Sequence, residues 1–208
     1  MGVSADKRAG HPVPYMASTG WYRVYLGARL AGATDAEASA EATAKVISRR
    51  RDLCRTVVKG GGSQPPLLLS VPICGGAATV KRCAPGSWSV SDHGRWSDIH
   101  LGALEAAYGS APYYPHFAPL IRPLLSAPCG RFADLSAAIH RIVLSALSLE
   151  ENLGSLRELI AARPELAEAL ARDNSAGVTD EISIFDVIFN KGTTALYTLI
   201  QHPSAITQ

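Results

Sequence analysis

The sequence predicts an α+β fold in which a small, early β-sheet is followed by a predominantly helical C-terminal half. Two observations support this class. An apolar run at 67–73 follows a glycine- and proline-rich break, and beyond Gly94 apolar residues recur mostly at helical spacing. The chain has 208 residues, of which 47% are apolar and 18% charged, a globular composition. A chain of this size fits one domain, so residues 1–208 are expected to form a single unit.

The first part of the chain is expected to change from irregular to helical. Glycine and proline oppose regular structure near its start, and residues 1–10 are expected to be disordered. Apolar positions then recur at helical spacing, which predicts a short amphipathic helix over 21–30. The following stretch, 31–44, is rich in Ala and Glu and is expected to be helical from its propensity alone.

The sheet is expected to lie just beyond this region. Residues 60–66 read Gly-Gly-Gly-Ser-Gln-Pro-Pro and are interpreted as a flexible connector. The run 67–73 is apolar almost throughout, which predicts a strand covered on both faces. A second strand is expected within 80–90, and glycines around the two segments favour a loose hairpin.

Helices are expected from Gly94 onward, so that residues 148–208 form a helical C-terminal part. Proline punctuates one helical piece near residue 115 and provides a break or a new helix start at Pro164. The expected helices span 96–107, a short piece within 112–123, 135–147, 153–171, 183–190 and 193–200.

Composition excludes several classes of function. The 20 Lys and Arg residues nearly balance 18 Asp and Glu, which predicts no strong attraction to nucleic acid or to membranes. No apolar run is long enough for membrane insertion, and the N-terminus lacks the apolar core of a secretory signal. The four cysteines have no close-spaced pair, which favours reduced thiols, a cytoplasmic location and no metal site. The glycine run lacks the residues of a phosphate-binding loop, and no cofactor is expected.

One basic cluster stands out against this nearly neutral background. Arg49, Arg50, Arg51 and Arg55 lie close together, a short distance after Lys45. Guanidinium groups bind phosphate and carboxylate with two parallel hydrogen bonds, so the cluster is a candidate anion site. A solvated basic face is the alternative interpretation.

A second candidate site lies around the start of the helix predicted at 96–107. His93 and His100 are seven residues apart and can face one cavity, where neutral imidazoles can take or give protons. Trp96 shares a helix face with His100. In the alternative, Asp92 or Ser91 caps the turn, while Trp96 and His100 belong to the core.

Several of these residues also carry a resemblance to a known family. Residues 89–100 read SVSDHGRWSDIH, and Tyr108 and a Pro-Tyr pair follow them. The segment 69–73 ends in a Val-Pro step, and 183–192 reads SIFDVIFNKG. In these motifs the chain resembles the WbqC family, whose members are associated with bacterial surface polysaccharides such as O-antigen. His11 and Tyr15 keep the spacing of the family's opening motif, while its usual Gln-Pro is replaced by Pro12-Val13.

The resemblance implies a cytoplasmic transferase in surface-polysaccharide biosynthesis. Its substrate would be a nucleotide-activated or carrier-linked sugar, and the reaction an acyl or aminoacyl transfer. Lys45 and Arg51 keep the family's spacing of a lysine followed six residues later by an arginine. The implied catalytic residues are His93, His100, His11 and Asp92, and the implied substrate-binding residues are Lys45, Arg51, Trp96 and Tyr108.

A different class of function remains open beside the enzyme. The chain would then be a non-catalytic scaffold for a polysaccharide-synthesis complex, with docking surfaces on 31–44 and on the helix within 133–147. It would present an exposed apolar patch of several hundred square ångströms and lack a deep polar pocket. Homo-oligomerisation is compatible with either function.

Overall fold

The computed structural model describes residues 13–61, 64–127, 130–172 and 182–201. Within these ranges the chain is mostly helical and contains one two-stranded antiparallel sheet near its N-terminal end, which confirms the α+β class. The segment 1–10 expected to be disordered, the candidate residue His11 and part of the connector at 60–66 lie outside the described residues.

The sheet is formed by a strand that the sequence did not predict and one that it did. β1 (Arg55–Val58) pairs with β2 (Leu67–Ser70), with Arg55 opposite Ser70 and Val58 opposite Leu67. β1 also meets the C-terminal part of the chain along its other edge. There Val57 forms a parallel bridge with Ile182, and the Ser183 amide donates a hydrogen bond to the Val57 carbonyl. β1 is therefore held between two segments that are distant in sequence.

The second expected strand, within 80–90, is wrong. That region contains helix α3 (Gly76–Arg82) and a single 3₁₀ turn, η2 (Pro85–Ser87), and Val90 contributes only an isolated bridge to Ile73. Gly75 and Gly76 have φ of 76° and 58°, so the chain leaves the extended conformation there and enters a helix.

The expectation that both faces of the strand at 67–73 are covered is also wrong. Leu67 and Leu68 are 40% and 59% exposed, whereas Leu69 is buried. Helices cover one face of this two-stranded sheet, and its other face lies at the surface, as is common for antiparallel sheets.

The two N-terminal helices form at the expected places. α1 (Thr19–Leu30) starts where the Ser18 hydroxyl accepts a hydrogen bond from the Trp21 amide, and most of its residues are buried. After it, α2 (Asp35–Val46) begins at a reciprocal cap between Thr34 and Glu37. Its start shows that the Ala- and Glu-rich stretch becomes helical slightly later than residue 31.

The remaining helices follow the predicted apolar periodicity. Pro164 starts a new helix, as expected, while the proline-punctuated piece is a longer continuous helix than predicted. Pro115, Pro119 and Pro123 are four residues apart and exposed, so they lie on one outward face of this helix. These helices are α4 (Trp96–Tyr108), α5 (Tyr114–Ser126), α6 (Phe132–Ala146), α7 (Leu149–Ala162), α8 (Pro164–Arg172), α9 (Phe185–Lys191) and α10 (Ala195–Gln201), with the 3₁₀ turns η1 (Arg50–Cys54) and η3 (Gly192–Thr194).

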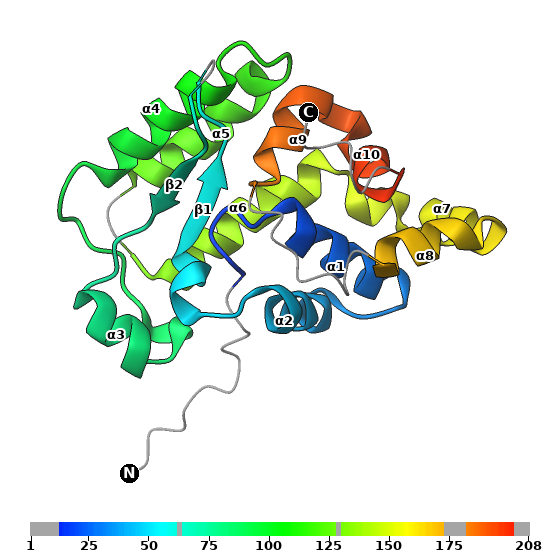
Figure 1. Cartoon of the computed structure of the whole chain (residues 1–208), viewed down its shortest axis with the longest axis horizontal. Helices are drawn as coiled ribbons and strands as arrows, with labels where there is room; N and C mark the ends of the chain where they lie inside the picture. Colours follow the sequence, from blue (N-terminus) through cyan, green and yellow to red (C-terminus); the bar gives the residue numbers. More distant parts are fainter. Residues whose placement is uncertain (1–12, 62–63, 128–129, 173–181, 202–208) are drawn as a thin grey trace.

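Figure 1 shows how these elements divide the molecule. The sheet, α3, α4 and α5 lie on one side, and α1, α2, α7, α8 and α10 lie on the other. α6 contacts α5 and η2 on the first side and α7 on the second, so it connects the two. Among the described residues no single helix has the length and apolar character to cross a membrane; α6 and α7 meet these criteria only together, as a pair bent by 55°.

A cationic cavity as the candidate functional site

A cavity opens between η1, the adjoining ends of the two strands, and α3. Its volume is about 820 Å³, within the range of about 300–1,000 Å³ usual for small-molecule sites. Its lining contains five cationic side chains and no carboxylate. The lining residues are Arg49, Arg50, Arg51, Cys54, Arg55, Ser70, Val71, Pro72, Ile73, Gly76, Ala77, Val80 and Lys81.

Local backbone structure brings these cations together. The 3₁₀ turn η1 folds the consecutive arginines around one bend, and β1 begins directly after it at Arg55. The opposite wall is fixed by the ladder, which continues beyond the strands because the Val71 amide donates to the Cys54 carbonyl at 2.8 Å. α3 follows the positive-φ glycine turn and carries Lys81 into the lining. The cavity therefore depends on the turn at Gly75 and Gly76, after which the chain forms α3 instead of the expected second strand.

The cations of the cavity are weakly neutralised by the protein itself. Arg51 and Arg55 share one carboxylate, Asp52, at 3.8 and 3.9 Å, too long for a hydrogen bond. Arg50 donates at 3.3 Å to the Cys83 carbonyl. Within the described parts of the chain, Arg49 and Lys81 form no ion pair. Such an excess of positive charge attracts an anion.

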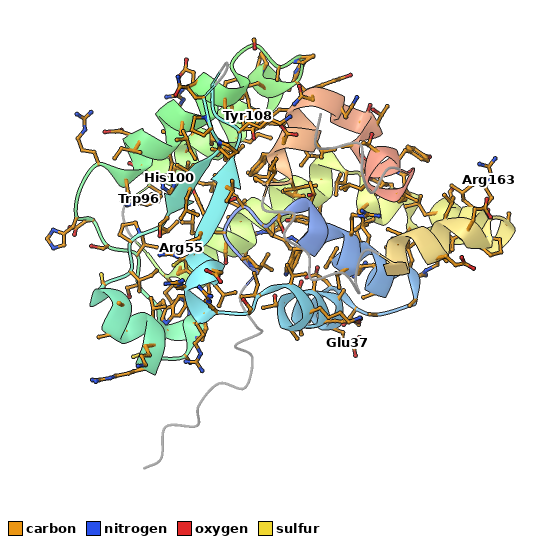
Figure 2. The ribbon with its side chains drawn as sticks, in the orientation of Figure 1. Glu37, Arg55, Trp96, His100, Tyr108 and Arg163 are labelled. Carbon is orange, nitrogen blue, oxygen red and sulfur yellow. The ribbon has the colours of Figure 1, made fainter. Side chains whose placement is uncertain are left out.

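Arg55 is the most enclosed of these side chains. Figure 2 shows it at the start of β1, between α3 and α2. Its side chain is 32% exposed, but its Nε is buried and has no hydrogen-bond partner among the described residues. A buried donor without an acceptor costs about 1–3 kcal/mol.

A second cavity adjoins the first and shares two lining residues with it. Its volume is about 540 Å³, and both Arg49 and Arg55 line it as well. The other lining residues are mostly apolar or hydroxyl-bearing, together with Asp52: Pro14, Ala17, Ser18, Val46, Ile47, Ser48, Thr56, Val57, Pro66 and Leu68.

His100, the first of the two candidate histidines, is part of the packed core. It is 2% exposed, its Nδ1 lies 2.8 Å from the Tyr15 hydroxyl, and its ring meets that of Trp96 edge-on. Burial lowers its pKa to about 4, against the smaller opposing effect of a hydrogen bond that the ring donates to the Ser70 backbone. His100 is therefore neutral at pH 7.

His93 lies in a different environment from His100. It is exposed, in the turn before α4, where its amide donates to the Ser91 hydroxyl. Asp92 beside it is exposed too, so neither group is held against the buried imidazole. Neither histidine lines the two cavities above or a third, smaller one of about 210 Å³. The structure thus does not bring the two imidazoles into one of these cavities, and their catalytic role stays a prediction.

The predicted substrate-binding residues are also dispersed. Arg51 lines the large cavity, whereas Lys45 is exposed on α2 and pairs with Glu41 at 2.6 Å. Trp96 is half-buried, lines the small third cavity and donates through its indole N–H to the Ser91 carbonyl. Tyr108 is buried, and its hydroxyl accepts a hydrogen bond from the Lys59 amide. Figure 2 shows His100 and Trp96 together on the α4 side of the sheet, apart from Arg55.

Two buried polar clusters were not recognised from the sequence. In one, the Tyr22 hydroxyl lies 2.8 Å from His140 Nδ1, and His140 Nε2 lies 3.3 Å from Asp35 Oδ1. In the other, Lys59 Nζ lies 3.2 Å from the carboxylate of Asp186, whose pKa is raised by burial against the influence of that lysine. The partners in both clusters are far apart in sequence, so no local spacing could have indicated them.

Some residues of the large cavity were likewise missed. The arginine cluster was visible in the sequence, but the contributions of Ser70, Ile73 and Lys81 were not, because α3 was interpreted as part of a hairpin. Cys54 also lines the cavity; its thiol donates to the Arg51 carbonyl, and burial raises its pKa. Among the described residues, no group of three His, Cys, Asp or Glu side chains could hold a metal ion.

Comparison with known proteins gives one match. The model of the WbqC-like protein family matches residues 54–177, which is more than half of the 208 residues. No curated protein and no solved structure matches the chain. The matched segment includes one wall of the cationic cavity, from Cys54 to Lys81, together with α4 and its preceding turn. The chain belongs to the WbqC-like protein family.

Proposed function

We propose that the chain binds the phosphate-bearing part of an activated sugar in the large cationic cavity, and that it acts as a cytoplasmic transferase in the biosynthesis or modification of a bacterial surface polysaccharide. The observation that carries this proposal is the concentration of five cations, without a carboxylate, in the lining of one cavity. The resemblance of its motifs to the WbqC family supplies the biological setting.

The energetics of the cavity favour a phosphate ligand. A hydrogen bond to a charged group contributes about 1.5–3 kcal/mol net. Arg49, Arg50 and Arg51 are exposed, so solvent screening places their individual contributions at the low end of that range. Arg55 is more enclosed, so solvent screens its charge less and its contribution to anion binding is expected to be the largest.

The uncharged part of the ligand is expected to rest on the apolar wall of the cavity. Val71, Pro72, Ile73 and Val80 form this wall opposite the arginines. A cavity with an apolar wall and a few converging polar groups is the usual form of a small-molecule site. Acyl or aminoacyl transfer to the sugar remains the proposed reaction, with His93 and His100 as the proposed proton-transfer groups.

The scaffold alternative receives less support. Of the large hydrophobic side chains in the described parts of the chain, those that are exposed are Leu67, Leu68, Ile99, Leu120 and Tyr197. None of them lies in 31–44 or 133–147, the surfaces proposed for docking. α2 instead places Glu37, Glu41 and Lys45 at the surface.

A binding experiment tests the proposal directly. Isothermal titration of the full chain with N-acetylglucosamine 1-phosphate at low ionic strength is expected to show saturable binding. The double variant R51Q/K81Q should weaken binding about tenfold or more, because it removes two cations from the lining. The matched control is R163Q, an exposed arginine at the far end of the molecule from Arg55 in Figure 2. Equal affinities for all three proteins would contradict the proposed site.

A cellular experiment tests the biological role. Surface polysaccharide from cells with and without the gene is compared by mass spectrometry. Loss of one specific substituent on deletion would support a transferase and would identify the group transferred. An unchanged polysaccharide would contradict it.

A further inference from the structure

We propose that the ligand is a diphosphate esterified at both ends, with its phosphates between Arg49 and Arg55 and its two organic ends in the two adjoining cavities. This inference rests on the proposed function, because it concerns the same cationic site. It names the class of activated sugar, which a site for a single phosphate would leave open.

The first argument comes from the walls that the cavities share. Arg49 and Arg55 line both the 820 Å³ and the 540 Å³ cavity, so the space between their side chains opens in two directions. A ligand centred there has room for a substituent on each side. A phosphate monoester has one substituent and would leave the second cavity to water.

The second argument concerns charge. Across both cavities five cations face one carboxylate, that of Asp52, which is shared at long distance by two arginines. Each guanidinium fork matches one phosphate in bidentate fashion. Two forks at the junction therefore match two phosphates better than one.

The third argument assigns the two ends. The large cavity has the apolar wall described above, which suits a planar base or a hydrocarbon chain. In the smaller cavity the Ser18 hydroxyl accepts a hydrogen bond from the Trp21 amide, and the Thr56 hydroxyl donates one to the Met16 carbonyl. Ser48 and Asp52 are further hydrogen-bonding groups in its lining and can bind the hydroxyls of a sugar. The sugar is therefore assigned to the smaller cavity.

Either a nucleoside or a lipid carrier can provide the other end of such a diphosphate. The experiment separates these sources by calorimetric titration of the full chain with three probes: UDP-N-acetylglucosamine, farnesyl-diphospho-N-acetylglucosamine and N-acetylglucosamine 1-phosphate. At least one diphosphate is expected to bind about tenfold or more tightly than the monophosphate, since it gains at least one charge-assisted hydrogen bond. The tighter of the two diphosphates identifies the carrier.

Two bulky substitutions locate the ends of the ligand. Ser48 and Ala77 are exposed and each lines one cavity, so S48W and A77W obstruct the smaller and the larger cavity while leaving the core intact. Both variants should weaken diphosphate binding tenfold or more, whereas A78W, an exposed neighbour on α3 outside both linings, should not. Thermal unfolding of each variant verifies that it is folded.

The outcomes separate the two proposals. If the diphosphates bind no more tightly than the monophosphate and S48W has no effect, the two-cavity ligand is refuted while the anion site stands. If none of the three probes binds to the native chain, both proposals fail together.

Discussion

The polar groups around α1 and those around η1 differ in the partners that the protein supplies. Around α1 three contacts join side chains of three helices: Tyr22 with His140, His140 with Asp35, and Tyr25 with Asp35 at 2.6 Å. Two buried atoms there, Arg29 Nε and Ser39 Oγ, have no hydrogen-bond partner among the described residues. The ring of Trp21 stacks on that of Tyr25 and meets His140 edge-on. These contacts hold the side chains around α1 in one packing arrangement.

Around η1 cationic side chains predominate instead. Four arginines and a lysine converge on a cavity, their one nearby carboxylate is distant, and the buried Nε of Arg55 lacks an acceptor among the described residues. An unpartnered buried atom therefore occurs in both regions, and the excess of cations in the lining of a cavity is what distinguishes η1. The comparison teaches that the two regions differ in charge: tyrosine, histidine and aspartate contact one another around α1, whereas cations outnumber carboxylates around η1.

The largest effect on stability is expected from a substitution of Trp21, in the region around α1. The variant W21A removes a fully buried aromatic ring and should lower the free energy of unfolding by about 3–5 kcal/mol. Chemical denaturation measures this change, and I99A, at a side chain that is 62% exposed, is the control. If W21A remains folded, it should still bind phosphate in the large cationic cavity. A loss of binding by folded W21A would show that the two regions are coupled.

The next largest effect on stability distinguishes the two candidate histidines. H100A removes the buried partner of the Tyr15 hydroxyl and should lower the free energy of unfolding by about 2–4 kcal/mol. H93A, at an exposed side chain, should change it by less than about 0.5 kcal/mol. If H100A instead abolishes polysaccharide modification and leaves stability unchanged, His100 is a proton-transfer group rather than a core residue.

Stability should also depend on pH through His100. Its pKa falls from 6.5 in the unfolded chain to about 4 in the folded one, because burial disfavours the charged ring. Between these values the unfolded state binds more protons, so stability is complete above pH 6.5 and declines as the pH falls toward 4, by about 3 kcal/mol in all. Denaturation midpoints at several pH values should follow this decline, and H100Q should flatten it. An equally steep profile in H100Q would assign the dependence to other groups.

The smallest effect is expected from relieving repulsion at the cavity. R49A removes one unpaired cation and should raise the free energy of unfolding by at most about 0.5 kcal/mol, while weakening phosphate binding. R163A removes the same charge at a remote exposed position and should leave binding unchanged. A clear destabilisation by R49A would mean that this arginine is structural.

Much of the helical part of the fold could be predicted from the sequence. Large apolar residues recur every three or four positions in α4 and α6, and Pro164 can start a helix but cannot continue one. The region of the sheet was harder to predict. β1 has four residues and shows no apolar alternation, while α3 buries none of its side chains and therefore leaves no periodic pattern.

The candidate site was predictable only in part. The arginines at 49–51 and Arg55 are close in sequence, so their clustering was visible. The other wall comes from β2 and α3, and its position depends on strand pairing and on a glycine turn rather than on local composition. The inward position of His100 follows from the packing of α4 on the sheet, which spacing alone does not determine.

The attachment of β1 to the segment at Ile182 and Ser183 has a consequence for biosynthesis of the chain. Arg55 emerges from the ribosome early, but the strand that begins with it acquires its second neighbour only when residues more than 120 positions later have been made. The nascent chain therefore exposes this strand edge through most of its translation. Until that late segment docks, the strand that carries Arg55 is paired along one edge only, and the newly made protein is expected to gain affinity for the proposed ligand in its last step of folding.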